Sequence, residues 1–108
     1  MDTALKAIAD PRRREILRLV SLSELPASDI ASHFGDVSRS AISQHLGVLR
    51  SANLVRERRD GNRRLYRVND EEMTRLRTFL DQYWSSGLDR LKSAAEAAEK
   101  RKRQQWQN

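Results

Sequence analysis

One short stretch of the chain concentrates arginine and small hydrogen-bonding side chains. Its members are Ser38, Arg39, Ser40, Ser43, Gln44, His45 and Arg50. Arginine and glutamine can each form two hydrogen bonds with the edge of one base, and guanidinium groups also pair with phosphate. If this stretch is helical, we expect Arg39, Ser43 and Gln44 to contact bases. Ser38 and Ser40, near the start of the helix, are expected to meet phosphate.

A second group of basic residues surrounds the dipeptide Asp60-Gly61. Its candidate contacts with an anion are Arg58, Arg59, Asn62, Arg63 and Arg64. Residues 38–69 hold eight arginines and two acids, so their net charge of +6 equals that of the whole chain. A basic surface confined to one part of a small domain is typical of a polyanion partner. We expect that partner to be double-stranded DNA.

The sequence offers little for catalysis or for metal binding. Its two histidines, His33 and His45, are separated, and no nucleophile stands beside a candidate base. Cysteine is absent, which excludes disulfides and thiolate metal sites. We expect no enzymatic activity, no cofactor and no bound metal. Two readings of His45 stay open, a contact with DNA and a structural hydrogen bond.

The composition is that of a polar, charge-rich chain of 108 residues, with 38% hydrophobic and 33% charged residues. This length suffices for one domain with a small core. No run approaches the roughly 20 consecutive apolar residues of a membrane span, and residues 1–3 open no signal-peptide pattern. We therefore expect a cytoplasmic protein without a membrane partner.

Four helices are expected to position the first group. A short first helix ends at Asp10, which also caps a second helix beginning at Pro11. A third short helix follows, and Ser38 caps the fourth. Apolar residues at 42, 46 and 49 give the fourth helix one buried face. The opposite face, which carries Arg39, is then exposed to solvent. The third and fourth helices, joined by residues 35–37, predict a helix-turn-helix.

The second group is expected on a hairpin that follows the fourth helix. Residues 54–59 and 63–68 alternate as strands do, and Asp60-Gly61 predicts a tight turn. Asn69 is expected to cap a last helix over 70–103, with Glu72 completing a capping box. The predicted fold is mainly α with a small β-hairpin. Residues 1–69 form a winged helix-turn-helix domain with its wing over about 54–69, and 104–108 form a disordered tail.

The last helix carries an apolar stripe that is longer than the core of such a small domain could cover. The stripe includes Leu80, Tyr83, Trp84, Leu88 and Leu91. A second copy related by twofold symmetry is the commonest cover for such a face, so we expect a homodimer. Tyr83 and Trp84 also leave open an aromatic cleft between protomers for a small apolar inducer.

Several segments, in this order, resemble the ArsR-type winged-helix transcriptional repressors of bacteria. They run from Ala9 to Leu17, from Val37 to Leu46, from Val48 to Arg50, through Leu54-Val55 and from Asp60 to Tyr66. The resemblance covers about residues 4–70. It implies a homodimer on an inverted-repeat operator, with an interface formed by the first and last helices. Leu5 and Ile8 would then join the stripe of the last helix in the interface.

Departures from the family pattern bear on metal sensing. Metal-sensing members read Glu-Leu-Cys-x-Cys-Asp-Leu in the third helix, whereas this chain has Pro26 and Ser28 at the thiolate positions. Other members bind zinc or nickel through Asp and His on the last helix, which here has Asp81 and Asp89 but no histidine. The chain therefore resembles the metal-independent branch, which includes autorepressors of the SdpR type. Asn53 replaces a usual glycine and tolerates a left-handed backbone.

These expectations converge on a metal-independent homodimeric repressor, with its own promoter as the expected target. Two alternatives stay open. A small molecule in the aromatic cleft could release the repressor from DNA. Alternatively, the winged helix could be a protein-interaction module, which would show no sequence-specific affinity for DNA.

Overall fold

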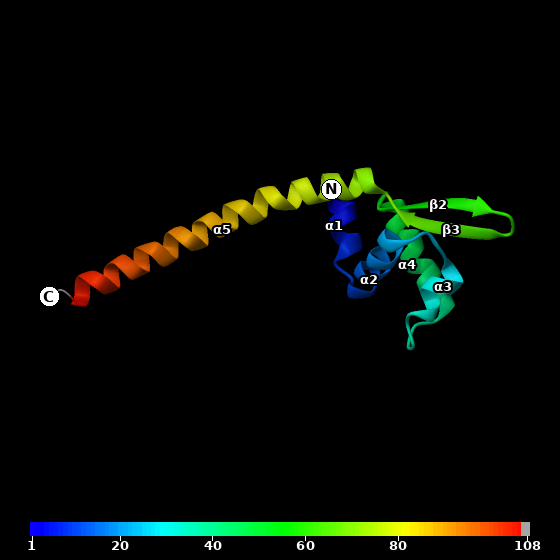
Figure 1. Ribbon diagram of the computed structural model, residues 1–108, viewed down its shortest axis with the longest axis horizontal. Coiled ribbons are helices and arrows are strands. Elements are labelled where there is room, and N and C mark those ends of the chain that lie inside the picture. The colour runs from blue at the N-terminus through cyan, green and yellow to red at the C-terminus, as the bar shows by residue number, and fades with distance from the viewer. Residues whose placement is uncertain (107–108) are drawn as a thin grey trace. The chain divides into compact units, whose positions relative to one another are not determined.

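The computed structural model describes residues 1–106, without the side chains of Ser85 and Trp106. Its elements are α1 (Asp2–Ile8), α2 (Pro11–Leu22), β1 (Leu25–Pro26), α3 (Ala27–Ser32), α4 (Arg39–Ser51), β2 (Val55–Asp60), β3 (Arg63–Val68) and α5 (Asp70–Trp106) (Figure 1). The described residues form two compact units, one over Met1–Leu76 and the other from Arg77 onward. The predicted fold class is confirmed, since helices predominate and the sheet is small.

Asp10 makes the corner between α1 and α2. Its backbone is extended, and its carboxylate accepts hydrogen bonds from the amides of Arg12 at 2.8 Å and Arg13 at 3.3 Å. The Arg13 guanidinium reaches back to the Ala7 carbonyl at 2.6 Å. Because α1 ends in unpaired carbonyls, this arginine caps its C-terminus while Asp10 caps the N-terminus of α2.

The helix-turn-helix consists of α3 and α4. Ser38 begins α4 by accepting a hydrogen bond on Oγ from the Ala41 amide at 3.1 Å, as predicted. On α4, Ile42, Leu46 and Leu49 are almost completely buried, and they share the core with residues of α2 and α3. This stripe sets the rotation of α4 about its axis, so its opposite face is exposed.

The wing is part of a three-stranded antiparallel sheet rather than an isolated hairpin. The strand order is β1-β3-β2, with Leu25 opposite Tyr66 and Glu57 opposite Tyr66 on the other side. The expected hairpin is confirmed, and Gly61 adopts a φ of 61° in its turn. The extra strand, β1, was not predicted because two residues ending in proline give no alternating pattern. Proline is tolerated there because β1 lies at the sheet edge.

The link between α4 and the wing depends on two asparagines. Asn53 has a φ of 62°, which confirms the expected left-handed conformation. Its carbonyl accepts a hydrogen bond from Asn69 Nδ2 at 2.8 Å. The predicted cap of α5 by Asn69 is wrong, since Asn69 Oδ1 is buried and has no hydrogen-bond partner among the described residues. The capping box is also absent, because the Asn69 amide donates to Leu54 and Glu72 pairs with Arg75 at 2.7 Å.

α5 is continuous over 37 residues and passes through Ser85-Ser86-Gly87 without a break. It includes Gln104, Gln105 and Trp106, which were expected in a disordered tail, and the remaining two tail residues lie outside the described residues. Lysine, arginine and glutamine are good helix formers, and no glycine or proline follows Gly87 to end the helix. Among the described residues, no helix is long and apolar enough to cross a bilayer.

We predict that Asp10→Ala lowers the free energy of unfolding by about 1 kcal/mol at neutral pH. Partial burial opposes ionisation of Asp10, but the Arg12 and Arg13 amides and the Arg13 charge outweigh it and lower the pKa of the carboxyl below 3.8. A carboxyl whose pKa is lowered by folding stabilises the fold above its unfolded pKa and loses that effect as the pH falls. The difference between wild type and variant should therefore shrink below about pH 4.

Urea unfolding at one protein concentration measures both effects. Asp36→Ala is the matched control, because Asp36 is 75% exposed and its ion-pair partner among the described residues is the half-exposed Arg12. The control should lose less than about 0.5 kcal/mol. An equal loss in both variants would contradict a capping role for Asp10.

Candidate nucleic-acid interface

The exposed face of α4 carries the residues predicted to contact bases. Arg39, Ser40, Ser43 and Gln44 are all exposed, and no partner within residues 1–106 engages their side chains. They occupy the N-terminal half of α4, where backbone amides also favour anions. A rigid helix thus presents free donors and acceptors to solvent, which is the arrangement needed to read base edges in a major groove.

The wing and α4 share one open groove. Arg39 and Ser43 of α4 line it together with Asn62, Arg63 and Arg64 of the hairpin. Its full lining is Pro26, Ala27, Ser28, Arg39, Ser43, Asn62, Arg63, Arg64 and Tyr66. The structure therefore brings together five of the predicted contacts, which come from two separate stretches of sequence.

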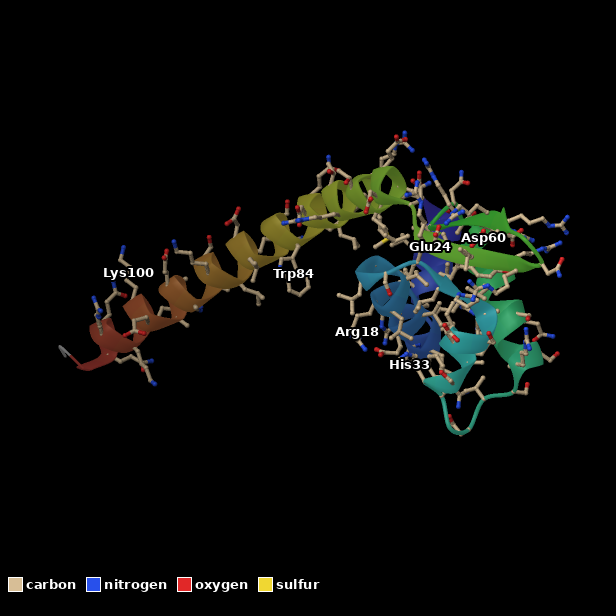
Figure 2. All side chains as sticks on the ribbon, turned by 45° about the vertical axis from the view of Figure 1, so that its right-hand side comes forward. Arg18, Glu24, His33, Asp60, Trp84 and Lys100 are labelled. Atoms are coloured by element: carbon tan, nitrogen blue, oxygen red, sulfur yellow. The ribbon has the colours of Figure 1, made fainter. Side chains whose placement is uncertain are left out.

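The predicted wing residues are not equivalent. Arg58 makes a bidentate ion pair with Glu24, with Nη2 to Oε1 at 2.6 Å and Nε to Oε2 at 2.9 Å. This hydrogen-bonded pairing lowers the pKa of Glu24 and raises that of Arg58. Figure 2 labels Glu24 beside the sheet. In contrast, Arg59 and Arg63 have no ion-pair partner among the described residues. The free positive charge of the wing therefore comes from Arg59 and Arg63 more than from Arg58.

Two residues predicted on the DNA-reading surface face protein groups. His45 is half-buried, and its Nδ1 lies 3.4 Å from Arg13 Nη1 of α2. This contact favours the structural reading of His45. Arg50, at the C-terminal end of α4, forms an ion pair with Glu57 of β2 at 2.7 Å. Glu57 was not predicted as a site residue, because its sequence signal is no more than an acid within an arginine-rich strand.

The predicted interface residues differ in exposure. Leu5 and Ile8 of α1 are partly buried against the core of the first unit. In the second unit, the stripe is open in the single chain, with exposed fractions of 40% for Leu80, 66% for Tyr83, 71% for Trp84, 50% for Leu88 and 68% for Leu91. Figure 2 shows Trp84 projecting from α5.

Metal ligands do not gather on the part of the chain that the structure describes. No three side chains of histidine, cysteine, aspartate or glutamate lie together there in a way that could hold an ion. At the positions where metal-sensing relatives carry thiolates, Pro26 is buried and pairs with Leu65, and Ser28 is exposed.

Fold and surface together define a class of protein. A helix-turn-helix with a polar outer face on its second helix, followed by a basic antiparallel hairpin, is a winged helix-turn-helix DNA-binding domain. Residues 10–57 match the family model for bacterial regulatory proteins of the arsR family. The chain is also 41% identical over 69 residues to the transcriptional repressor SdpR of Bacillus subtilis, across 64% of this chain and 76% of SdpR. The chain belongs to the ArsR family of transcriptional regulators, whose function is regulatory and not enzymatic.

Two solved structures extend the comparison. A crystal structure of a possible transcriptional regulator for arsenical resistance is 42% identical and has a TM-score of 0.74, covering 84% of this chain and 93% of its own. The homodimeric winged helix-turn-helix domain of Mb0332 from Mycobacterium bovis, a possible ArsR-family regulator, is 32% identical with a TM-score of 0.64. That match covers 78% of this chain and 77% of the neighbour.

We predict that Arg63→Gln lowers the salt dependence of DNA binding, whereas Arg58→Gln leaves it nearly unchanged. Each lost phosphate contact should reduce the slope of log K against log salt by about 0.9. Arg63 has no side-chain partner among the described residues, whereas Glu24 engages both Nε and Nη2 of Arg58. Fluorescence anisotropy with a scrambled duplex at several salt concentrations measures the slope. Equal slopes for the two variants would contradict the assignment of Arg58 to the ion pair with Glu24.

Proposed function

We propose that this chain is a sequence-specific repressor that acts as a homodimer on an inverted-repeat operator, independently of metal. The observation that carries the proposal is the shared groove, in which Arg39 and Ser43 of α4 lie beside Asn62 and Arg63 of the wing. The relative SdpR is itself a transcriptional repressor. Repression follows when the bound dimer occludes a promoter, and we propose the protein's own promoter, in the cytoplasm, as one target.

In the proposed complex, α4 enters the major groove by its exposed face. Arg39 donates two hydrogen bonds to guanine, and Gln44 pairs with adenine through its amide. Ser40 and the free amides at the start of α4 bind phosphate, while Ser38 remains the helix cap. The wing places Arg59, Asn62 and Arg63 along the backbone beside the same groove.

Dimerisation is proposed through the apolar stripe of α5. The leucine, tyrosine and tryptophan side chains of the stripe are 40–71% exposed in a single chain, and they gain hydrophobic stabilisation when a second copy covers them. The homodimeric state of the Mb0332 domain supports a homodimer for this chain as well. Two linked copies bind two half-sites together, which raises the affinity above that of one domain.

Metal independence is proposed from the donor set. Soft ions are held by thiolates, and the chain has no cysteine in its 108 residues. The two positions that hold thiolates in metal-sensing relatives are a buried proline and an exposed serine. We infer that DNA binding neither requires nor responds to zinc, nickel or arsenite.

The DNA-binding proposal predicts that Arg39→Ala or Gln44→Ala weakens binding to the operator by about 1–3 kcal/mol and relaxes the preference at one base position. Fluorescence anisotropy compares DNA from upstream of the gene with a scrambled duplex, first in EDTA and then with each ion added. The expected result is tight, selective binding that no ion changes. Release by an ion would contradict metal independence, and equal weak binding to both duplexes would favour the protein-interaction module.

The dimer proposal predicts that Leu88→Glu yields monomers and weakens operator binding about 100-fold or more. A charge placed in an apolar interface cannot be buried without a partner. Analytical ultracentrifugation measures the mass, with Leu22→Glu as a control, because Leu22 is 72% exposed on α2 outside the proposed interface. A dimer with unchanged affinity in Leu88→Glu would contradict the proposal.

A further inference from the structure

Glu57 is an acid within a strongly basic surface. It lies on β2 between Arg56 and Arg58, on a wing where six of the residues from 56 to 67 are arginines. Its side chain is only 20% exposed, although β2 carries exposed arginines on both sides of it. A carboxylate close to a DNA-binding face repels phosphate, so its presence there needs a physical reason.

The two oxygens of Glu57 engage two different arginines from two elements. Oε2 accepts a hydrogen bond from Arg50 Nη1 of α4 at 2.7 Å, and Oε1 lies 3.7 Å from Arg64 Nη1 of β3. Burial raises the pKa of Tyr66, and a hydrogen bond with Glu57 contributes to the same shift. Tyr66 and Arg64 both line the groove shared by α4 and the wing. One carboxylate thus connects the end of the recognition helix to the wall of the groove.

Stability alone does not explain this arrangement. Arg50 and Arg64 are more than half exposed, and ion pairs of exposed arginines contribute little to the free energy of folding. The arrangement does restrict where two guanidinium groups can lie. Phosphate contacts carry no sequence information themselves, but they set the register of a recognition helix on the duplex. A restrained pair of arginines therefore favours one register, whereas mobile arginines accept many.

We propose that Glu57 is a specificity-determining positioning residue, which holds Arg50 and Arg64 so that their phosphate contacts place α4 in one register on the operator. The inference rests on the proposed function, because it assumes that α4 reads DNA. Glu57 then has two opposite effects. It weakens binding to DNA in general, and it strengthens the preference for the operator.

Glu57→Gln tests the proposal, because glutamine keeps the shape and removes the charge. The probes are the duplex that the wild-type protein enriches most from a random-sequence library and a scrambled duplex of the same composition. Affinity for the scrambled duplex should rise about threefold, since one repulsive charge is lost. The ratio of the affinity for the enriched duplex to the affinity for the scrambled duplex should fall about tenfold. A fall of this size is comparable with the effect of one mismatched base pair in the site.

Glu24→Gln is the matched control. Glu24 also pairs with a wing arginine, at 2.6 Å and with 25% exposure, so the variant makes the same change in charge and also breaks a close ion pair. However, Glu24 pairs with Arg58 alone, whereas Glu57 joins Arg50 of α4 to Arg64, which lines the groove. The control should keep the specificity ratio within about twofold of wild type. Thermal melting of both variants shows whether they are folded.

An unchanged ratio in folded Glu57→Gln, or an equal fall in Glu24→Gln, would overturn the inference and leave the proposed function standing. A wild-type protein that enriches no sequence would overturn both. If Glu57→Gln does not fold, Arg50→Gln breaks the same pair from an exposed side chain and should lower the ratio similarly. If Arg50→Gln lowers affinity for both duplexes equally, the positioning role is excluded.

Discussion

The burial of Ile42, Leu46 and Leu49 is the constraint on which the rest of the structure depends. These side chains anchor α4 to α2 and α3, and they leave the helix only one orientation in which its apolar face is covered. The same packing therefore determines which residues of α4 face the solvent. Because α1, α2 and the sheet share the same core, the wing is also held at a defined place beside α4.

Charge is distributed unevenly over the surface of the domain that this core holds together. Carboxylates of Glu24 and Glu57 engage Arg58, Arg50 and Arg64, while Arg39, Arg59 and Arg63 have no such partner within the described residues. The net charge of +6 for the chain therefore conceals which guanidinium groups a carboxylate holds in place. The arginines without partners lie on α4 and near the hairpin turn, where the groove is open.

The sequence predicted those features that depend on neighbouring residues. Asp10 before Pro11 and Ser38 before Arg39 are local caps, and the stripe of α4 is visible from its spacing. The cap at Asn69 was wrong because the side chain is recruited by the carbonyl of Asn53, sixteen positions earlier. Similarly, Arg58 and Arg59 are indistinguishable in sequence. Only the fold brings Glu24, thirty-four positions before Arg58, to one of them. Local sequence patterns do not reveal contacts between residues that are far apart along the chain.

The symmetry of the preferred DNA sequence tests the account most directly, because it depends on reading by α4 and on dimerisation together. Duplexes selected from a random library by the full chain should converge on an inverted repeat. The centres of its half-sites should lie about one helical turn apart, roughly 34–36 Å, as two recognition helices in successive major grooves require. A single half-site, or no convergence at all, would contradict the account of a dimer that reads DNA through α4.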